Sequence, residues 1–209
     1  MSTGLVMNWA RPAIGNSVGA ESGSPRSTSR AGSSNCSSQP RFRRTWSPAT
    51  SRSRVPHDEA VFGGAGNQVM ASVAAGGPGL VAVGFGESRG NEGAMVWTSP
   101  DGVTWSRVVH NEVVFGGSGS QGMRSVATGV AGLVAAGFDQ SGGDQDAAVW
   151  TSPDGITWSR VPHDEVAFGG GRNQRMTSMT IEGASLVITG YDSSGGDQDA
   201  AVWIFPDGE

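Results

Sequence analysis

The stretch VWTSPDGVTW at residues 96–105 returns as VWTSPDGITW at residues 149–158, and a shortened form, VWIFPDGE, occupies residues 202–209. Four sets of identical residues keep the same interval of 53 positions: Met70, Met123 and Met176; Leu80, Leu133 and Leu186; Gly84, Gly137 and Gly190; Trp97, Trp150 and Trp203. A period of this length is typical of a propeller, a solenoid or another repeat array. We therefore expect three copies of one structural unit.

Each unit has the composition of short strands joined by tight turns. Small and β-branched residues fill positions 124–130 and 132–138, with a glycine-containing turn between them. Two further strands, DAAVWTS and VTWSRV, are expected on either side of the Ser-Pro-Asp-Gly turn. Proline suits the second position of such a turn, and glycine suits the left-handed position that follows. Four strands per unit is the pattern of a propeller blade.

The Ser-Pro-Asp-Gly turn predicts a hairpin with a three-residue loop at positions 100–102. In that hairpin the cross-strand pairs are Ser99 with Val103, Thr98 with Thr104 and Trp97 with Trp105. The two tryptophans then share one face and supply the large apolar surface that a glycine-rich sheet otherwise lacks. We interpret them as structural residues and not as a stacking platform for a ligand.

Two family resemblances follow from these motifs. SPDGVTW (99–105) and SPDGITW (152–158) resemble the Asp-box of sialidase-like propellers, also called the BNR repeat and usually written S-x-D-x-G-x-T-W. Both copies are one residue shorter between Asp and Thr. The stretch GFDQSGGDQDAAVWTSPDGITWSRV (137–161) also resembles a kelch repeat. Both resemblances imply an all-β fold of four-stranded propeller blades across residues 53–209, as a partial propeller or as half of an oligomeric ring.

The repeat region is expected to begin at Ser53, within the fourth strand of a blade, and to end after a third strand. In many closed propellers such a terminal strand completes the last blade. Here Thr50, Ser51 and Arg52 stand where the repeat predicts Ile, Thr and Trp. We interpret residues 1–52 either as a disordered basic tail, rich in Ser and Arg, or as the product of a shifted reading frame.

The composition limits the classes of partner. The chain has 209 residues, 34 glycines, no lysine and one cysteine, Cys36, so it forms no intramolecular disulfide. Residues 1–52 carry seven arginines and one acid, whereas residues 53–209 carry seven arginines and eighteen acids. The basic tail lacks interleaved aromatics, so no nucleic-acid partner is predicted. No apolar run is long enough for a membrane span, and no signal peptide is visible, although relatives of sialidase-like propellers are often exported.

Three blades are fewer than the roughly four to eight of closed propellers. The end blades would expose a sheet edge and an apolar face. We therefore expect a homo-oligomer, in which two copies supply six blades, or a longer parent propeller.

Two groups of polar residues are expected on one loop face of the blades. The first lies in the segments between blades, and its members are the ligand-face candidates His57, Asp58, Glu59, His110, Glu112, His163, Asp164 and Glu165. The second lies in the loops DQSGGDQD and DSSGGDQD and contains Asp139, Asp144, Asp146, Asp192, Asp197 and Asp199. Calcium binds six to eight oxygens, so these loops are candidate calcium ligands, with solvated loop acids as the alternative. No other cofactor is expected.

The predicted function is that of a non-enzymatic binding or scaffold module that presents this loop face to a glycan or a protein. The alternatives are a glycoside hydrolase of the sialidase type, a vestige of one, and a non-functional propeller fragment. A sialidase needs an arginine cluster, a tyrosine nucleophile and an acid/base carboxylate. The chain has Tyr191 alone, and it aligns with Phe85 and Phe138 in the repeat, which favours a core role. No catalytic residue is therefore predicted.

Overall fold

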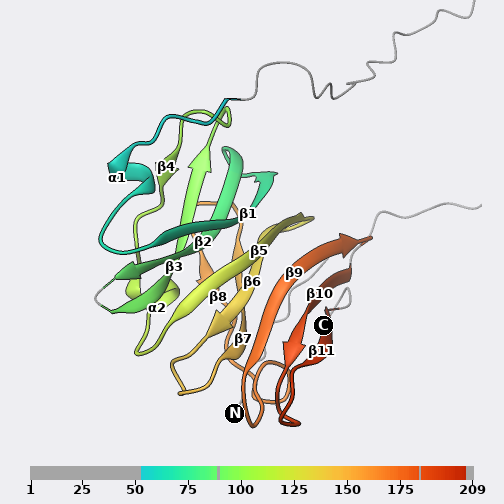
Figure 1. Ribbon diagram of the computed structural model, residues 1–209. Helices are drawn as coiled ribbons and strands as arrows, with labels where there is room; N and C mark the ends of the chain where they lie inside the picture. The colour runs from blue at the N-terminus through green and yellow to red at the C-terminus, as the bar shows by residue number, and fades with distance from the viewer. Residues whose placement is uncertain (1–52, 89, 184, 206–209) are drawn as a thin grey trace, which may run out of the picture. The chain divides into compact units, whose positions relative to one another are not determined.

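The computed structural model describes residues 53–88, 90–183 and 185–205, and β-strands dominate this part of the chain (Figure 1). Two single-turn helices, α1 (Glu59–Phe62) and α2 (Glu112–Phe115), lie among the strands. The described residues from Val55 onward belong to one compact unit. The predicted all-β fold is confirmed, whereas the basic tail predicted for residues 1–52 lies outside the described residues. None of the described helices has the length and apolarity needed to cross a membrane.

The strands form three antiparallel sheets in chain order. The first sheet contains β1 (Gln68–Gly76), β2 (Gly79–Ser88), β3 (Asn91–Ser99) and β4 (Ser106–Arg107). The second contains β5 (Gln121–Gly129), β6 (Gly132–Asp139), β7 (Asp146–Ser152) and β8 (Ser159–Arg160). The third contains β9 (Gln174–Glu182), β10 (Ser185–Asp192) and β11 (Asp199–Phe205). The first strands β1, β5 and β9 begin 53 residues apart.

Most expected strands are present. The predicted strands at 124–130 and 132–138 correspond to β5 and β6, and DAAVWTS is β7. The third sheet has three strands within the described residues. Ser53 and Arg54 were expected within the fourth strand of a blade, but they belong to no strand.

The predicted pairing across the Ser-Pro-Asp-Gly turn is wrong. In the structure Trp97 pairs with Arg107 and Thr98 with Ser106, so Trp97 and Trp105 are not cross-strand partners. The turn is longer than predicted because the Asp101 side chain binds backbone amides that would pair between the strands in a tight hairpin. Asp101 Oδ1 accepts from the amides of Val103 at 2.8 Å and Thr104 at 2.6 Å. The same arrangement occurs around Asp154 in the second sheet.

The repeated glycine of each second strand has a steric cause. Each first strand has a bulge, and there its backbone comes close to the second strand. A Cβ atom at Gly84 would lie 1.8 Å from the carbonyl oxygen of Val69. The corresponding distances at Gly137 and Gly190 are both 1.9 Å. A side chain at these three positions would therefore force the paired strands apart.

Each sheet has two faces, and both carry apolar residues. We call the face that carries Met70, Met123 or Met176 the leading face and the opposite one the trailing face. The trailing face of the first sheet packs on the leading face of the second in one buried cluster, with the members Val81, Val83, Ala94 and Val96 from the first sheet and Met123, Val126, Leu133, Ala135, Ala148 and Trp150 from the second. The core of the fold therefore lies between sheets.

A second joint of the same kind connects the second and third sheets. Ala136, Ala147 and Val149 on the trailing face of the second sheet pack against Met176 and Ile188 on the leading face of the third. The first strands also share hydrogen bonds across both joints. Val126 N donates to Ser72 Oγ at 3.2 Å, and Met179 N donates to Ser125 Oγ at 3.1 Å. Each donor–acceptor pair spans 54 positions, so the two joints use equivalent atoms.

The repeated tryptophan of each third strand fixes the segment that precedes its sheet. The indole Nε1 of Trp97 donates to the Val61 carbonyl at 2.8 Å, and that of Trp150 donates to the Val114 carbonyl at 2.8 Å. Trp203 makes the corresponding bond to Ala167 at 2.9 Å. These tryptophans are therefore anchors between sheet and linker, as well as apolar core residues.

Replacing Trp150 with Phe should lower the free energy of unfolding by about 1–3 kcal/mol, because the Val114 carbonyl loses its donor where Trp150 is fully buried. Urea denaturation followed by fluorescence or circular dichroism measures the change. The matched control is Trp203→Phe, which removes the same bond from a half-buried ring and should cost less. Equal losses at both positions would contradict the argument from burial.

The Asp154 turn predicts a dependence of stability on pH. Hydrogen bonds from the Thr157 and Ile156 amides lower the pKa of Asp154 from its ordinary 3.8 to about 2. The carboxylate therefore stabilises the fold fully above the unfolded pKa, and this contribution is lost as the pH falls from 3.8 towards about 2. The melting-temperature difference between the unmodified chain and Asp154→Asn should shrink over that window. Asp197→Asn, on an exposed loop, should show no such trend.

Candidate functional site

One end of the sheets gathers the loops between second and third strands and the linkers that precede each sheet. The Gln140 amide donates to the Ser120 carbonyl at 2.8 Å, and the Ser193 amide donates to the Asn173 carbonyl at 2.9 Å. The Ser-Pro-Asp-Gly turns lie at the opposite end. There Gly77, in the β1–β2 turn, approaches the Asp154 carbonyl so closely that a Cβ atom would lie 2.4 Å from it. The predicted loop face is thus a contiguous set of segments.

A glutamine–aspartate–serine cluster holds each acidic loop to its sheet. Asp139 Oδ1 accepts from Gln121 Nε2 at 2.8 Å, from the Ser141 amide at 2.9 Å and from Ser141 Oγ at 2.7 Å. Asp192 accepts equivalent bonds from Gln174 and Ser194 in the third sheet. The two aspartates that begin the predicted calcium loops therefore accept bonds from the protein itself.

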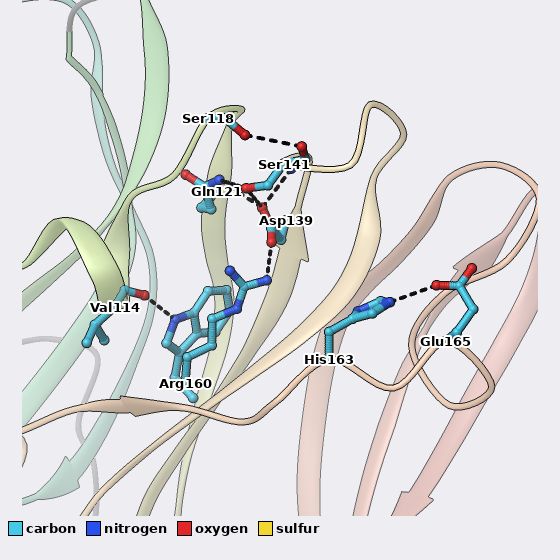
Figure 2. Close-up of polar contacts among 9 residues, drawn as sticks. Val114, Ser118, Gln121, Asp139, Ser141, Arg160, His163 and Glu165 are labelled. Atoms are coloured by element: carbon cyan, nitrogen blue, oxygen red, sulfur yellow. Dashed lines mark hydrogen bonds and ion pairs between the residues drawn. The ribbon is translucent and has the colours of Figure 1, made fainter.

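Arg160 completes this cluster in the second sheet (Figure 2). Its guanidinium pairs with Asp139 Oδ2, and its carbon lies 5.8 Å from the ring centroid of Trp150. Burial alone would raise the pKa of Asp139, but the donors Gln121, Ser141 and Arg160 together hold it below its ordinary value. The equivalent Arg107 of the first sheet donates instead to the carbonyls of Val61 and Gly63.

The three histidines belong to one repeated local arrangement and not to a shared centre. Nε2 of His57, His110 and His163 lies 3.0 Å from the carboxylate of Glu59, Glu112 and Glu165, respectively, two residues further along (Figure 2 shows the last pair). All six side chains are substantially exposed. The hydrogen bond from His57, followed by one from the Gly64 amide, lowers the pKa of Glu59. Within the described ranges, no three His, Cys, Asp or Glu side chains gather as a metal-ligand set.

The residue between histidine and glutamate caps the turn that follows. Asp58 accepts from the Ala60 amide at 2.9 Å at the start of α1, and Asn111 accepts from the Val113 amide at 3.0 Å at the start of α2. Asp164 makes the same bond to Val166 at 2.9 Å. An Asp or Asn in this position satisfies an otherwise unpaired amide. The predicted ligand-face residues Asp58 and Asp164 thus have a structural role in the linkers.

Of the remaining predicted acids, Asp144 and Asp197 lie on the loops, whereas Asp146 and Asp199 begin β7 and β11. Asp144, Asp197 and Asp199 are exposed, and Asp146 is half-buried. Burial raises the pKa of Asp146, His163 lowers it, and Glu165, Asp144 and Asp139 raise it further; the net pKa lies above its ordinary value. The structure brings Asp146 near the His163 linker and makes it the cross-strand partner of Asp139, as Asp199 is of Asp192 in the third sheet.

An open hollow of about 500 Å³ lies between the loops of the second and third sheets, lined by Gly143, Asp144, Arg172, Asn173, Ser193, Gly196 and Gln198. Gly143 and Gly196 shape these two loops, with φ angles of 116° and 111° that L-amino-acid side chains rarely tolerate. Asn173 Oδ1 accepts from the Gln145 amide at 2.9 Å and so ties the loop of the second sheet to the linker before β9. Of the lining residues, only Asp144 is among the predicted site residues.

Arginines and aromatic rings interleave across the three sheets. The guanidinium carbon of Arg124 lies 4.1 Å from the ring centroid of Phe85 and 5.3 Å from that of Phe138. That of Arg175 lies 4.4 Å from Phe138 and 5.9 Å from Tyr191. We call these five residues the arginine–aromatic stack. Such contacts contribute roughly 0.5–2 kcal/mol each, depending on exposure. Burial, followed by the charge of Arg175, lowers the pKa of Arg124.

Sequence reasoning did not predict the hollow or the stack. Arg172 has glycine at the equivalent positions of the other repeats, and Asn173 recurs only as Asn67, so no repeated motif pointed to this linker as part of a site beside the loop at 193–198. Arg124 and Arg175 lie at different positions of the repeat, yet the structure brings both to the same Phe138 ring. The repeated Gln121 and Gln174, 53 residues apart, were a signal for the clusters with Asp139 and Asp192.

Comparison with models of protein families, with curated proteins and with solved structures finds no match to this chain.

The acidic loops allow a direct test for calcium. Asp139 and Asp192 already accept hydrogen bonds from several donors, which a cation at their oxygens would have to displace. We therefore expect the melting temperature to be the same in calcium and in a chelator. Differential scanning calorimetry measures it, with magnesium as the control ion. A rise in calcium alone that is lost in Asp144→Asn would instead make these loops a calcium site.

Proposed function

We propose that residues 53–209 are β-propeller-type blades of the sialidase-like (Asp-box) kind. Three observations support this proposal. The described sheets are antiparallel, successive sheets pack face to face through equivalent positions, and the first strands β1, β5 and β9 contact one another in turn. The turns at Asp101 and Asp154, with their carboxylates bonded to backbone amides, also agree with the resemblance to an Asp-box.

The function we propose is non-enzymatic binding of a glycan or a protein by the loop face. The observation that carries this proposal is the hollow between the loops of the second and third sheets. It offers a carboxylate at Asp144, a guanidinium at Arg172 and an amide at Gln198, so donors and acceptors lie side by side. Sugar hydroxyls and peptide groups both donate and accept hydrogen bonds, and this lining can satisfy both directions.

The shape of the hollow favours an extended ligand over an enclosed small molecule. It is open to solvent, and polar residues dominate its lining, whereas sites for drug-sized molecules are usually deep and mostly apolar. An oligosaccharide or an exposed loop of another protein fits such a surface because it can keep part of its hydration while bonding to the lining residues.

A second candidate function, glycoside hydrolysis, rests on Asp146. Its pKa is raised, first by burial, and a raised pKa is the property of a general acid. Glycoside hydrolysis also needs a second carboxylate across the substrate, and Asp144 on the same loop is the nearest in sequence. Binding is preferred because Asp146 does not line the hollow.

The test is an oligosaccharide microarray probed with the labelled full-length chain, with hits titrated by surface plasmon resonance. We expect saturable binding of at least one oligosaccharide class without turnover. Arg172→Ala should weaken that binding by roughly tenfold or more, because a hydrogen bond to a charged group contributes about 1.5–3 kcal/mol. Gln198→Ala should weaken it to a smaller extent. The charged control is Glu182→Ala, at the opposite end of β9 from Arg172, and it should leave binding unchanged.

Three outcomes separate the candidates. Binding that survives Arg172→Ala and Gln198→Ala would contradict the assignment to the hollow. Cleavage of fluorogenic glycosides that is abolished by Asp146→Asn would favour the hydrolase. If no oligosaccharide binds, a protein ligand is the remaining form of the proposal, and cross-linking in which capture depends on Arg172 tests it.

A further inference from the structure

The leading face of the first sheet is exposed along β1, although Ala82 and Trp97 on the same face are buried. Met70 is 40% exposed, whereas its equivalents Met123 and Met176 are both 0% exposed. Val73 is 57% exposed, whereas its equivalent Val126 is 6% exposed. In the second and third sheets, the preceding sheet covers these positions. The first sheet has no preceding sheet among the described residues.

The trailing face of the third sheet is uncovered in the complementary way. Val202 is 61% exposed, whereas its equivalents Val96 and Val149 are 1% and 4% exposed. Ile204, on the same face, is 63% exposed. In the first and second sheets, the following sheet covers the positions of Val96 and Val149. The two uncovered faces are therefore the two halves of a joint that the chain already forms twice.

We propose that the leading face of the first sheet binds the trailing face of the third sheet of a second copy of this chain. The occupant follows from the repeat, because a leading face and a trailing face of the same sequence pattern pack on each other at both internal joints. Covering the two faces in this way removes the exposed Met70, Val73, Val202 and Ile204 from water. This inference does not depend on the ligand of the loop face.

The polar contacts of the internal joints have partners at the new one. Ser72 and Ser125 accept from the amides of Val126 and Met179. The serine of the third sheet equivalent to Ser72 and Ser125 is Ser178, which is exposed. The residue of the first sheet equivalent to Val126 and Met179 is Val73. At the proposed joint, the Val73 amide of one copy donates to Ser178 Oγ of the other.

The arginine–aromatic stack ends where the new joint begins. Arg175 packs on Phe138 of the preceding sheet, and the position equivalent to Arg175 in the first sheet is Val69, which is 38% exposed. At the proposed joint, Val69 of one copy therefore contacts Tyr191 of the other. The arginine–aromatic stack then contains no arginine at this joint besides Arg124 and Arg175 within each chain. The joint between copies is accordingly more apolar than the internal ones.

The contact is heterologous, because two different faces of the chain meet. Heterologous contacts close into a ring when the rotation permits and otherwise form open assemblies. Two copies provide six blades if each copy supplies three, within the roughly four to eight of closed propellers. A twofold ring uses both uncovered faces of each copy, and with a chain mass of 21.4 kDa its expected mass is 2 × 21.4 = 42.8 kDa.

The experiment measures the mass of the full-length chain in solution, by size-exclusion chromatography with light scattering over a wide range of concentration. We expect a two-chain species. Val73→Glu places a carboxylate on the leading face, and Val202→Glu places one on the trailing face. Each variant should raise the dissociation constant by at least about 100-fold, because a buried unpaired charge costs several kcal/mol. The control Val166→Glu, at a position 96% exposed in a linker, should leave the mass unchanged.

Mixing the two variants distinguishes a heterologous contact from a contact between identical faces. The Val73→Glu chain keeps an intact trailing face and the Val202→Glu chain an intact leading face, so the mixture should form a one-to-one pair through a single joint. Circular dichroism confirms that each variant is folded. A wild-type chain that stays monomeric, a single variant that still dimerises, or a folded mixture that fails to pair would each overturn the proposal. In the first case another segment of the chain or a different partner covers these faces.

Discussion

The contact between the trailing face of one sheet and the leading face of the next is the constraint on which the rest of the structure depends. Each sheet is a single layer with apolar residues on both faces, so no sheet forms a core alone. The apolar residues on both faces are buried only when sheets stack. Val83 on the first sheet and Met123 on the second, for example, are buried in the cluster between these two sheets. At the bulges, Gly84, Gly137 and Gly190 allow the first two strands of each sheet to stay close together.

Repeated and unrepeated polar residues have different roles in this chain. The repeated ones bind backbone groups or neighbours in their own unit: Asp101 and Asp154 hold a turn, and Asp58 and Asn111 cap a helix. They maintain the unit and say little about a ligand. Arg172, Arg124 and Arg175 have no equivalent arginine in the other repeats, and they lie in the hollow and in the stack. Individual chemistry in a repeat protein is therefore found where the copies differ.

The sequence was sufficient to predict the strands β5, β6 and β7 and the all-β fold, because alternating small and β-branched residues between glycine turns leave few other options. It was not sufficient for the pairing of β3 with β4. Propensities describe the turn residues one by one, whereas the register depends on the Asp101 carboxylate binding amides two and three residues away. The hollow could not be predicted from the sequence for a related reason. It joins residues 143–144, 172–173 and 193–198, and only the packing of one sheet on another brings these together.

The similarity of the three units also gives the chain an incorrect way to fold. The leading face of the third sheet carries Met176 and Ile188, where the second sheet carries Met123 and Ala135, so both faces are apolar and the third sheet competes with the second for the first. If the third sheet docks there, the second is looped out with both its faces exposed. Misassembly of this kind is characteristic of repeat proteins. During synthesis the second sheet leaves the ribosome before the third, and this order of emergence protects the correct arrangement. Refolding from denaturant lacks that protection and should populate the skipped arrangement as a slow, aggregation-prone species.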